Sequence, residues 1–167
     1  MKKLLLFAVV MIAFTAATFA QSSDTEQTTA TATIIGPLAL TKISDMDFGT
    51  IAVTGTAGTV VLGTDNSRTA VGPALVPPAA GVAASFTVSG EASRAFTITL
   101  PANGDVTLVN GANSMAANDF VHSAGGTPSL DGTGAAAFTV GATLVVGAAQ
   151  AAGVYTSANF PVTINYN

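Results

Sequence analysis

Residues 151–167, AAGVYTSANFPVTINYN, close the chain and decide how the rest of the sequence is interpreted. Within them Phe160, Val162, Ile164 and Tyr166 occupy every second position, separated by polar residues or proline. This alternation predicts a β-strand with one apolar face. A strand in this position either completes the sheet of its own chain or leaves an edge on which another strand can pair.

The same alternation recurs along the chain, and no stretch shows sustained helical spacing. Strands are expected at residues 30–34, 38–43, 58–63, 82–88, 96–100, 106–109, 114–121 and 138–146. Asn-, Gly- and Ser-rich segments separate them, and residues 89–93 are expected to turn a hairpin between the strands that contain Phe86 and Phe96. Short, half-polar strands at spacings near ten residues predict an all-β fold, an antiparallel immunoglobulin-like two-sheet sandwich.

The N-terminal residues have the pattern of a signal peptide. Lys2 and Lys3 precede an apolar run, and small residues lead up to Ala20, after which we expect cleavage. Residues 21–29 are then a flexible polar extension, and residues 30–167 form a single β-sandwich domain. No second apolar run follows, so we expect no membrane span and a secreted protein in the periplasm, on the cell surface or outside the cell. The chain has no cysteine, so its core must stabilise the domain without disulfides.

Charge is sparse and acidic. Charged residues make up 8% of the chain, where about 25% is usual. The net charge of −4 becomes −6 once Lys2 and Lys3 are removed with the signal peptide. Such a surface cannot form a basic patch, so nucleic acid is not an expected partner. A surface of small uncharged polar groups suits a protein that packs beside copies or relatives of itself, and it equally suits an ordinary secreted sandwich.

Two features of the closing segment have alternative interpretations. Gly153 and Tyr155 fit a tyrosine corner, in which the hydroxyl caps a nearby backbone carbonyl, although a simple turn before a half-buried Tyr fits equally. Tyr155 is odd-numbered, whereas the apolar residues from Phe160 onward are even-numbered. A β-bulge near residues 159–161 would absorb the extra residue in one long strand. The other interpretation is two strands joined by a turn at residues 157–159.

If one bulged strand ends the domain, the sandwich lacks the last strand of an immunoglobulin fold. An added strand from a neighbouring subunit could then supply main-chain hydrogen bonds and fill pockets with alternate side chains. Ala30, Ala32 and Ile34 are the candidate strand-exchange residues, and they serve equally well as the domain's own first strand. Farther along, Phe48 is expected in the core, and Gly49 at a bulge or a close backbone approach.

No residue pattern indicates catalysis or a cofactor. His122 is the only histidine, and Ser123 beside it on a strand would point to the opposite face. Asp45 and Asp47 supply two carboxylates, whereas calcium needs more oxygen ligands. Aromatic residues for stacking on sugars are scarce, because Trp is absent and there are two Tyr. We therefore expect a protein that is not an enzyme and that has no metal, cofactor or identified small-molecule ligand.

Several motifs resemble one family of exported bacterial proteins. The segments ATATIIGPLALTKISDMDFGTI, FTVSG, FTITLP and VGATLVVGAAQAAGVYTSANFPVTINYN are similar, in order, to the family called domain of unknown function 4402 (DUF4402). The DFG and AGVY…VTINY elements are also loosely similar to spore-coat-U-type pilins of chaperone–usher systems. The first resemblance implies a secreted Gram-negative β-domain without an established activity. The spacing from Tyr155 to Phe160 is one residue longer than in that family.

Two functions follow as hypotheses. The first is a non-enzymatic structural or surface protein, a pilus-like or adhesin-like subunit that pairs β-strands with copies or related subunits. The second is a self-complete secreted binding module that recognises a ligand through its long loops.

Overall fold

The computed structural model describes residues 23–77 and 80–167, so the predicted signal peptide lies outside the described residues. The chain divides into two units, Met1–Ile34 and Ile35–Asn167. In the first, the described residues 23–34 are exposed and form no regular element, so the strand predicted over residues 30–34 is wrong. In the second unit the strands run antiparallel and no helix occurs among the described residues, which confirms the predicted all-β sandwich class.

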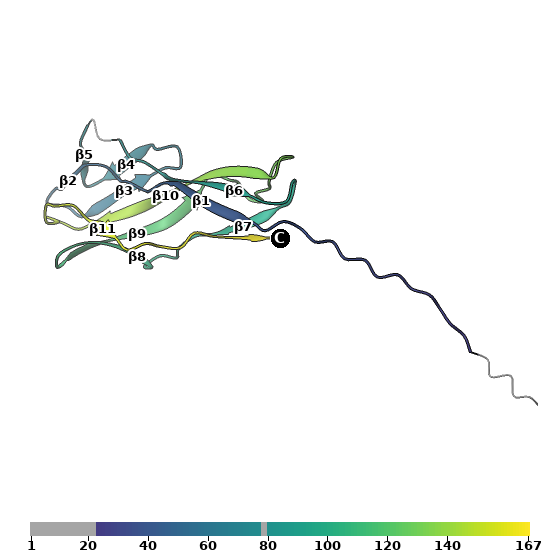
Figure 1. Cartoon of the computed structure of the whole chain (residues 1–167). Helices are drawn as coiled ribbons and strands as arrows, with labels where there is room; N and C mark the ends of the chain where they lie inside the picture. Colours follow the sequence, from purple (N-terminus) through teal and green to yellow (C-terminus); the bar gives the residue numbers. More distant parts are fainter. Residues whose placement is uncertain (1–22, 78–79) are drawn as a thin grey trace, which may run out of the picture. The chain divides into compact units, whose positions relative to one another are not determined.

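The larger sheet contains most of the predicted strands (Figure 1). Its strand order is β1-β6-β10-β9-β8-β11, and β3 pairs with both β10 and β4. The bounds are β1 Ala39–Ser44, β3 Gly58–Leu62, β4 Arg68–Val71, β6 Ala84–Ser89, β8 Val106–Asn110, β9 Asn113–His122, β10 Ala135–Val146 and β11 Thr156–Ser157. The predicted strands other than the first therefore form, with shifts of a few residues at their ends.

Strand β10 organises this sheet because it changes partner halfway along its length. Residues 135–140 pair with β6 and residues 142–146 pair with β3, while β9 lies along the other edge. Gly141 occupies the point of change, where an added Cβ would collide with the carbonyl oxygen of Leu62. The missing side chain allows the two neighbouring strands to approach β10 at the same place.

Two small sheets complete the domain, and they correct the predicted hairpin. β7, Phe96–Thr99, pairs with β12, Thr163–Tyr166, and β2, Ile51–Ala52, pairs with β5, Ala74–Leu75. Since β6 pairs with β1 and β10, residues 89–93 do not join a hairpin; they carry the chain from the large sheet to the small one. The residues of this turn identify it as a turn. Which sheet the following strand joins depends on its pairing with β12, near the other end of the domain.

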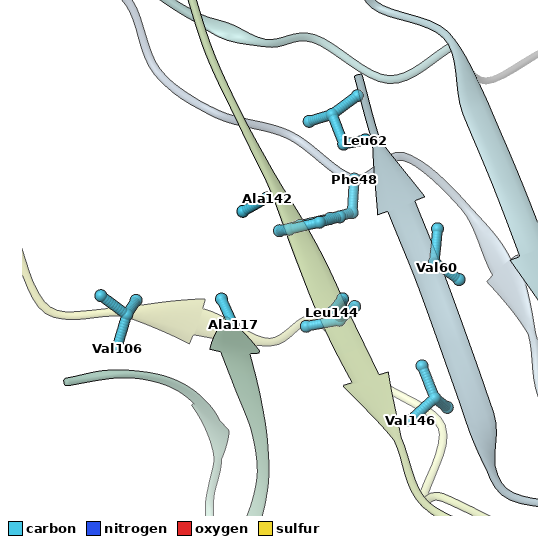
Figure 2. Packing of buried hydrophobic residues seen from close by; sticks show 8 residues of the cluster. All are labelled: Phe48, Val60, Leu62, Val106, Ala117, Ala142, Leu144 and Val146. Atoms are coloured by element: carbon cyan, nitrogen blue, oxygen red, sulfur yellow. The ribbon is translucent and has the colours of Figure 1, made fainter. Parts of the chain in front are cut away.

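The core consists of two apolar clusters. The first gathers side chains from β3, the second half of β10, β8 and β9 together with Phe48, and Figure 2 shows these eight residues. The second contains Phe86, Phe138 and Phe96, with Phe86 and Phe138 stacked at 5.2 Å between ring centroids. The β7–β12 sheet covers the second cluster through Ile98 and Ile164. The first cluster has no such cover, because Ile51 and Phe160 come from a two-residue strand and an irregular segment.

The closing segment does not form a bulged strand, so that prediction is corrected. β11 pairs with β8 in the large sheet, whereas β12 pairs with β7 in a different sheet. Residues 158–162 between them form neither a strand nor a turn. The change of parity in the sequence therefore marks the place where the chain leaves one sheet for another. The rival interpretation is correct in its two separate strands, although the turn that it places at residues 157–159 is not formed.

Candidate functional site

An apolar groove opens over the first core cluster. Its volume is about 1220 Å³, and it is lined by two chain segments together with inward side chains of the large sheet. We call residues 40–53 the β1 segment and residues 150–162 the tail segment. In Figure 1 the β1 segment leads from β1 to β2, and the tail segment passes through β11 on its way to β12. The groove therefore lies where the second layer of the sandwich is irregular.

The groove is lined by side chains that alternation in the strands directs inward. Leu108 of β8, Met115 and Phe120 of β9, and Leu144 and Val146 of β10 all contribute. Leu144 and Val146 are 1% exposed, whereas Leu108, Met115 and Phe120 are half-buried. Because an antiparallel strand buries one face only, an inward face without a covering strand leaves apolar surface in reach of a partner.

Few charges reach the groove. Among its described lining residues only Lys42, Asp45 and Asp47 are charged, and Lys42 forms an exposed ion pair with Asp45. Two valines on the bordering segments are exposed, Val53 by 42% and Val154 by 82%. Single exposed apolar side chains are common on protein surfaces. Exposed apolar side chains that lie beside an apolar groove are more typical of an interaction surface.

Both strands that adjoin the groove segments have an unpaired edge. β1 pairs with β6, and β12 pairs with β7, and in the described part of the chain neither has a second neighbour. Residues 158–162 of the tail segment belong to no strand. Unpaired backbone N–H and C=O groups along an edge are a template for an added strand.

Hydrogen bonds from one arginine hold the β1 segment in position. Arg68 donates through Nη1 to the carbonyl oxygens of Phe48, at 2.7 Å, and Thr50, at 3.3 Å. Between these residues Gly49 has a φ of +69°, and a Cβ there would collide with Arg68 Nη1 and the carbonyl oxygen of Ala80. The close backbone approach expected at Gly49 is therefore present, and Phe48 is buried in the core, 7% exposed.

Tyr155 orders the first part of the tail segment. Its hydroxyl donates to the carbonyl oxygen of Ala151 at 2.8 Å and accepts a hydrogen bond from Gln150 Nε2 at 2.9 Å. The bond back to a carbonyl four residues earlier is the one that a tyrosine corner makes. Farther along, the ring of Phe160 packs on that of Phe120 with 5.4 Å between centroids. The tail segment thus lines the groove without itself joining a sheet between Ser157 and Thr163.

The structure brings most of the predicted structural residues to this groove. Phe48, Gly49, Gly153, Tyr155, Phe160 and Val162 line it. Ile164 and Tyr166 instead pack on the second core cluster, and Ala30, Ala32 and Ile34 lie in the exposed unit that precedes the domain. Sequence reasoning missed Leu40, Leu108 and Met115 as groove residues. Their apolar face was legible, but nothing local shows that the face is left uncovered.

The candidate catalytic and metal groups are dispersed. Ser123 accepts a hydrogen bond from the Thr139 amide, and Asp119 accepts one from the Asn103 side chain. Neither of these hydrogen bonds involves His122. The Nδ1 atom of His122 is buried without a hydrogen-bond partner. Across residues 23–77 and 80–167, no group of three His, Cys, Asp or Glu side chains could hold a metal ion.

Two exposed carboxylates have lowered pKa values for structural reasons. Hydrogen bonds from the Ser67 hydroxyl and amide lower the pKa of Asp65. Bonds from the Ala135 amide and from Thr133 lower the pKa of Asp131, which stabilises the turn before β10. Neither residue lines the groove, so both shifts belong to loop architecture and not to a reactive site.

The fold and the groove define a class of protein, an antiparallel β-sandwich domain with an apolar groove over part of its core. The chain belongs to the family described as Domain of unknown function (DUF4402), which matches residues 38–166. No curated protein matches the chain, and no solved structure does. The similarity to spore-coat-U-type pilins is thus not shown. In the described part of the chain, no helix has the length and apolarity needed to cross a membrane.

Proposed function

We propose that this protein is a non-enzymatic, exported structural subunit that assembles by accepting a β-strand into the groove. The groove carries this proposal, because it brings half-buried apolar side chains next to the unpaired edge of β1. An added strand would satisfy both at once, burying apolar side chains on the core and pairing its backbone with an edge. The result would be a pilus-like or adhesin-like assembly of copies or related subunits.

The size and chemistry of the groove favour a polypeptide over a small molecule. Pockets for small ligands are usually about 300–1000 Å³ and combine apolar walls with a few convergent polar groups. This groove is larger, about 1220 Å³, and its described lining contains no His, Cys, Glu or Arg. Of the charged groups that it does contain, Lys42 and Asp45 are paired with each other, and Asp47 accepts a hydrogen bond from the Gly49 amide. Its chemistry is therefore packing and backbone pairing.

The predicted signal peptide supports export to the periplasm, the cell surface or the surrounding space, and the family resemblance implies a Gram-negative cell. Detection of a protein that begins at Gln21 in the secreted or surface fraction would support export. A chain that retains residues 1–20 and stays in the cytoplasm would contradict it.

A matched pair of variants on β1 tests the groove. Leu40 lines the groove and is half-buried, whereas its neighbour Thr41 is exposed and does not line it. Leu40→Glu places a charge in the path of an added strand and should abolish multimers of the chain that begins at Gln21. Thr41→Glu adds the same charge outside the groove and should leave multimers unchanged. Light scattering and unheated gel electrophoresis report the assembly state, and circular dichroism checks that each variant is folded.

A second pair on β8 guards against an effect specific to β1. Leu108 lines the groove, and Thr107 precedes it on the exposed side of the same strand. Leu108→Glu should disrupt assembly and Thr107→Glu should not. Multimers that persist in both groove variants would contradict the proposal. A protein that is monomeric at all concentrations would favour the self-complete binding module instead.

A further inference from the structure

The occupant of the groove can be inferred from the chain itself. Residues 29–34, which we call the donor segment, read TATATI and contain three β-branched Thr and one Ile. Such residues favour extended strands, and Ala30, Ala32 and Ile34 share one face by alternation. A strand of six residues extends about 20 Å, a usual length for a strand in a sheet. The segment is therefore suited to strand addition although it forms no strand in its own chain.

The exposure of the donor segment leaves its apolar face without a partner. Each residue from 29 to 34 is exposed, and Ile34 is 96% exposed, the largest value among the exposed large apolar residues in the described part of the chain. An Ile side chain in water forgoes the free energy that burial would provide. Residues 27–34 carry no charge, which matches a groove whose charges are confined to Lys42, Asp45 and Asp47.

The residues that follow the donor segment disfavour its return to the groove of the same chain. Gly36 is bonded through both backbone groups, because its N–H donates to Glu91 Oε2 and its carbonyl oxygen accepts from the Tyr166 hydroxyl. A tight turn back along β1 would fall at Gly36 and Pro37. The preferred type I′ hairpin turn needs positive φ at both central residues, and proline fixes φ near −65°. A second copy has no such constraint.

We propose that the donor segment of one copy adds as a strand to the groove of a second copy, with Ala30, Ala32 and Ile34 directed onto the half-buried apolar lining of the groove. This inference rests on the proposed function, since it names the partner of the same groove. Each copy then has one donor segment and one groove, which are formed by different residues of the chain. Such a head-to-tail contact links subunits in series, into a ring where the rotation between neighbours closes and into an open chain where it does not.

A complementation experiment tests the donor and the groove separately. One protein carries Leu40→Glu and keeps its donor segment; the other lacks residues 21–34 and keeps its groove. The truncated protein should fold, because both core clusters lie within residues 38–166. Each protein alone should be monomeric, and a mixture should yield a one-to-one dimer by light scattering. Failure to form this dimer while the unaltered chain forms multimers would overturn the donor assignment.

Substitutions in the donor segment supply the matched control. Ile34→Asp should weaken association by roughly 10- to 100-fold, as expected from losing one fully buried Ile, whereas Thr33→Asp on the other face should change it by less than about 3-fold. The same pair of changes in a synthetic peptide of residues 26–35, titrated onto the truncated protein, should give the same ranking. Equal effects of Ile34→Asp and Thr33→Asp would overturn the proposed orientation.

The remaining outcomes separate this inference from the proposed function. If Leu40→Glu abolishes multimers but deletion of residues 21–34 does not, the groove accepts a different strand and the donor assignment fails alone. If neither change affects multimers, the proposed function fails as well. If the unaltered chain is monomeric and binds the peptide only after deletion of residues 21–34, the segment fills its own groove, and assembly with a second copy is overturned.

Discussion

Replacement of Tyr166 by Phe should destabilise the domain, because one hydroxyl links three distant parts of the chain. The Tyr166 oxygen accepts a hydrogen bond from the Glu91 amide at 2.7 Å and donates one to the carbonyl oxygen of Gly36 at 3.2 Å. Gly36 precedes β1, Glu91 lies in the turn after β6, and Tyr166 belongs to β12. The hydroxyl therefore fastens the entry to β1 and the β6–β7 turn to the closing strand.

The expected loss follows from these two bonds. A hydrogen bond contributes about 0.5–1.5 kcal/mol net, and both bonds lie in an exposed region where water can replace the hydroxyl. Tyr166→Phe should therefore lower the free energy of unfolding by about 1–2 kcal/mol. Urea denaturation followed by circular dichroism measures this change, and an unchanged dependence on urea concentration would show that the unfolded state is unaffected.

A double-mutant cycle with Gly90 tests whether the Tyr166 hydroxyl itself is responsible for this loss. A Cβ added at Gly90 would overlap the Tyr166 hydroxyl and would contact Leu130 and Leu38. Gly90→Ala should thus be destabilising, but less so when Tyr166 is already Phe, with an interaction free energy of about 0.5 kcal/mol or more. A loss below about 0.3 kcal/mol for Tyr166→Phe, or strict additivity with Gly90→Ala, would refute the reasoning.

Three further predictions concern the core, the β1 segment and pH. Leu62→Ala should lower stability by about 3–5 kcal/mol in denaturant titrations, since Leu62 is fully buried, whereas Val61→Ala, 41% exposed, should cost under about 1 kcal/mol. Gly49→Ala should cost at least about 1 kcal/mol by the same assay, because φ there is +69° and Arg68 lies within contact of a Cβ. The pKa of Asp131 is lowered below 3.8, chiefly by the Ala135 amide bond, so its stabilisation should be complete above about pH 4 and lost as pH falls through the lowered value. Asp131→Asn should flatten this acid dependence in unfolding curves collected from pH 5 to 2; an unchanged slope would contradict it.

The local sequence pattern was sufficient to predict most strands and turns of the domain. The alternation of Phe138, Val140 and Leu144 predicted a long strand, and β10 contains all three on its buried face. The Asn- and Gly-rich residues 110–113 separate two predicted strands, and Asn110 and Asn113 pair at the end of the β8–β9 hairpin. These features depend on residues that are close in sequence, because side-chain direction repeats every two residues in a strand and turn geometry is set by a few neighbouring residues.

Pattern was insufficient where a strand's partner is distant in the sequence. The turn at residues 89–93 was correctly located, but the strand after it pairs with β12, nearly seventy positions away, as with Ile98 and Ile164. The parity change before Phe160 is visible in the sequence too, but local pattern does not decide between a bulge in one strand and two separate strands. Only the tertiary structure shows that the chain changes sheets there.

The sequence by itself determined that this chain is an antiparallel β-protein with few charges and a closing strand that has one apolar face. Each of these properties depends on composition or on residues that are close together in the sequence. The tertiary structure alone decided that the apolar side chains of Leu108, Met115 and Phe120 stay half-buried and line a groove. An inward face has the same alternation whether a strand covers it or not. Its cover depends on which distant segments pair with it, and that pairing is a property of the folded chain as a whole.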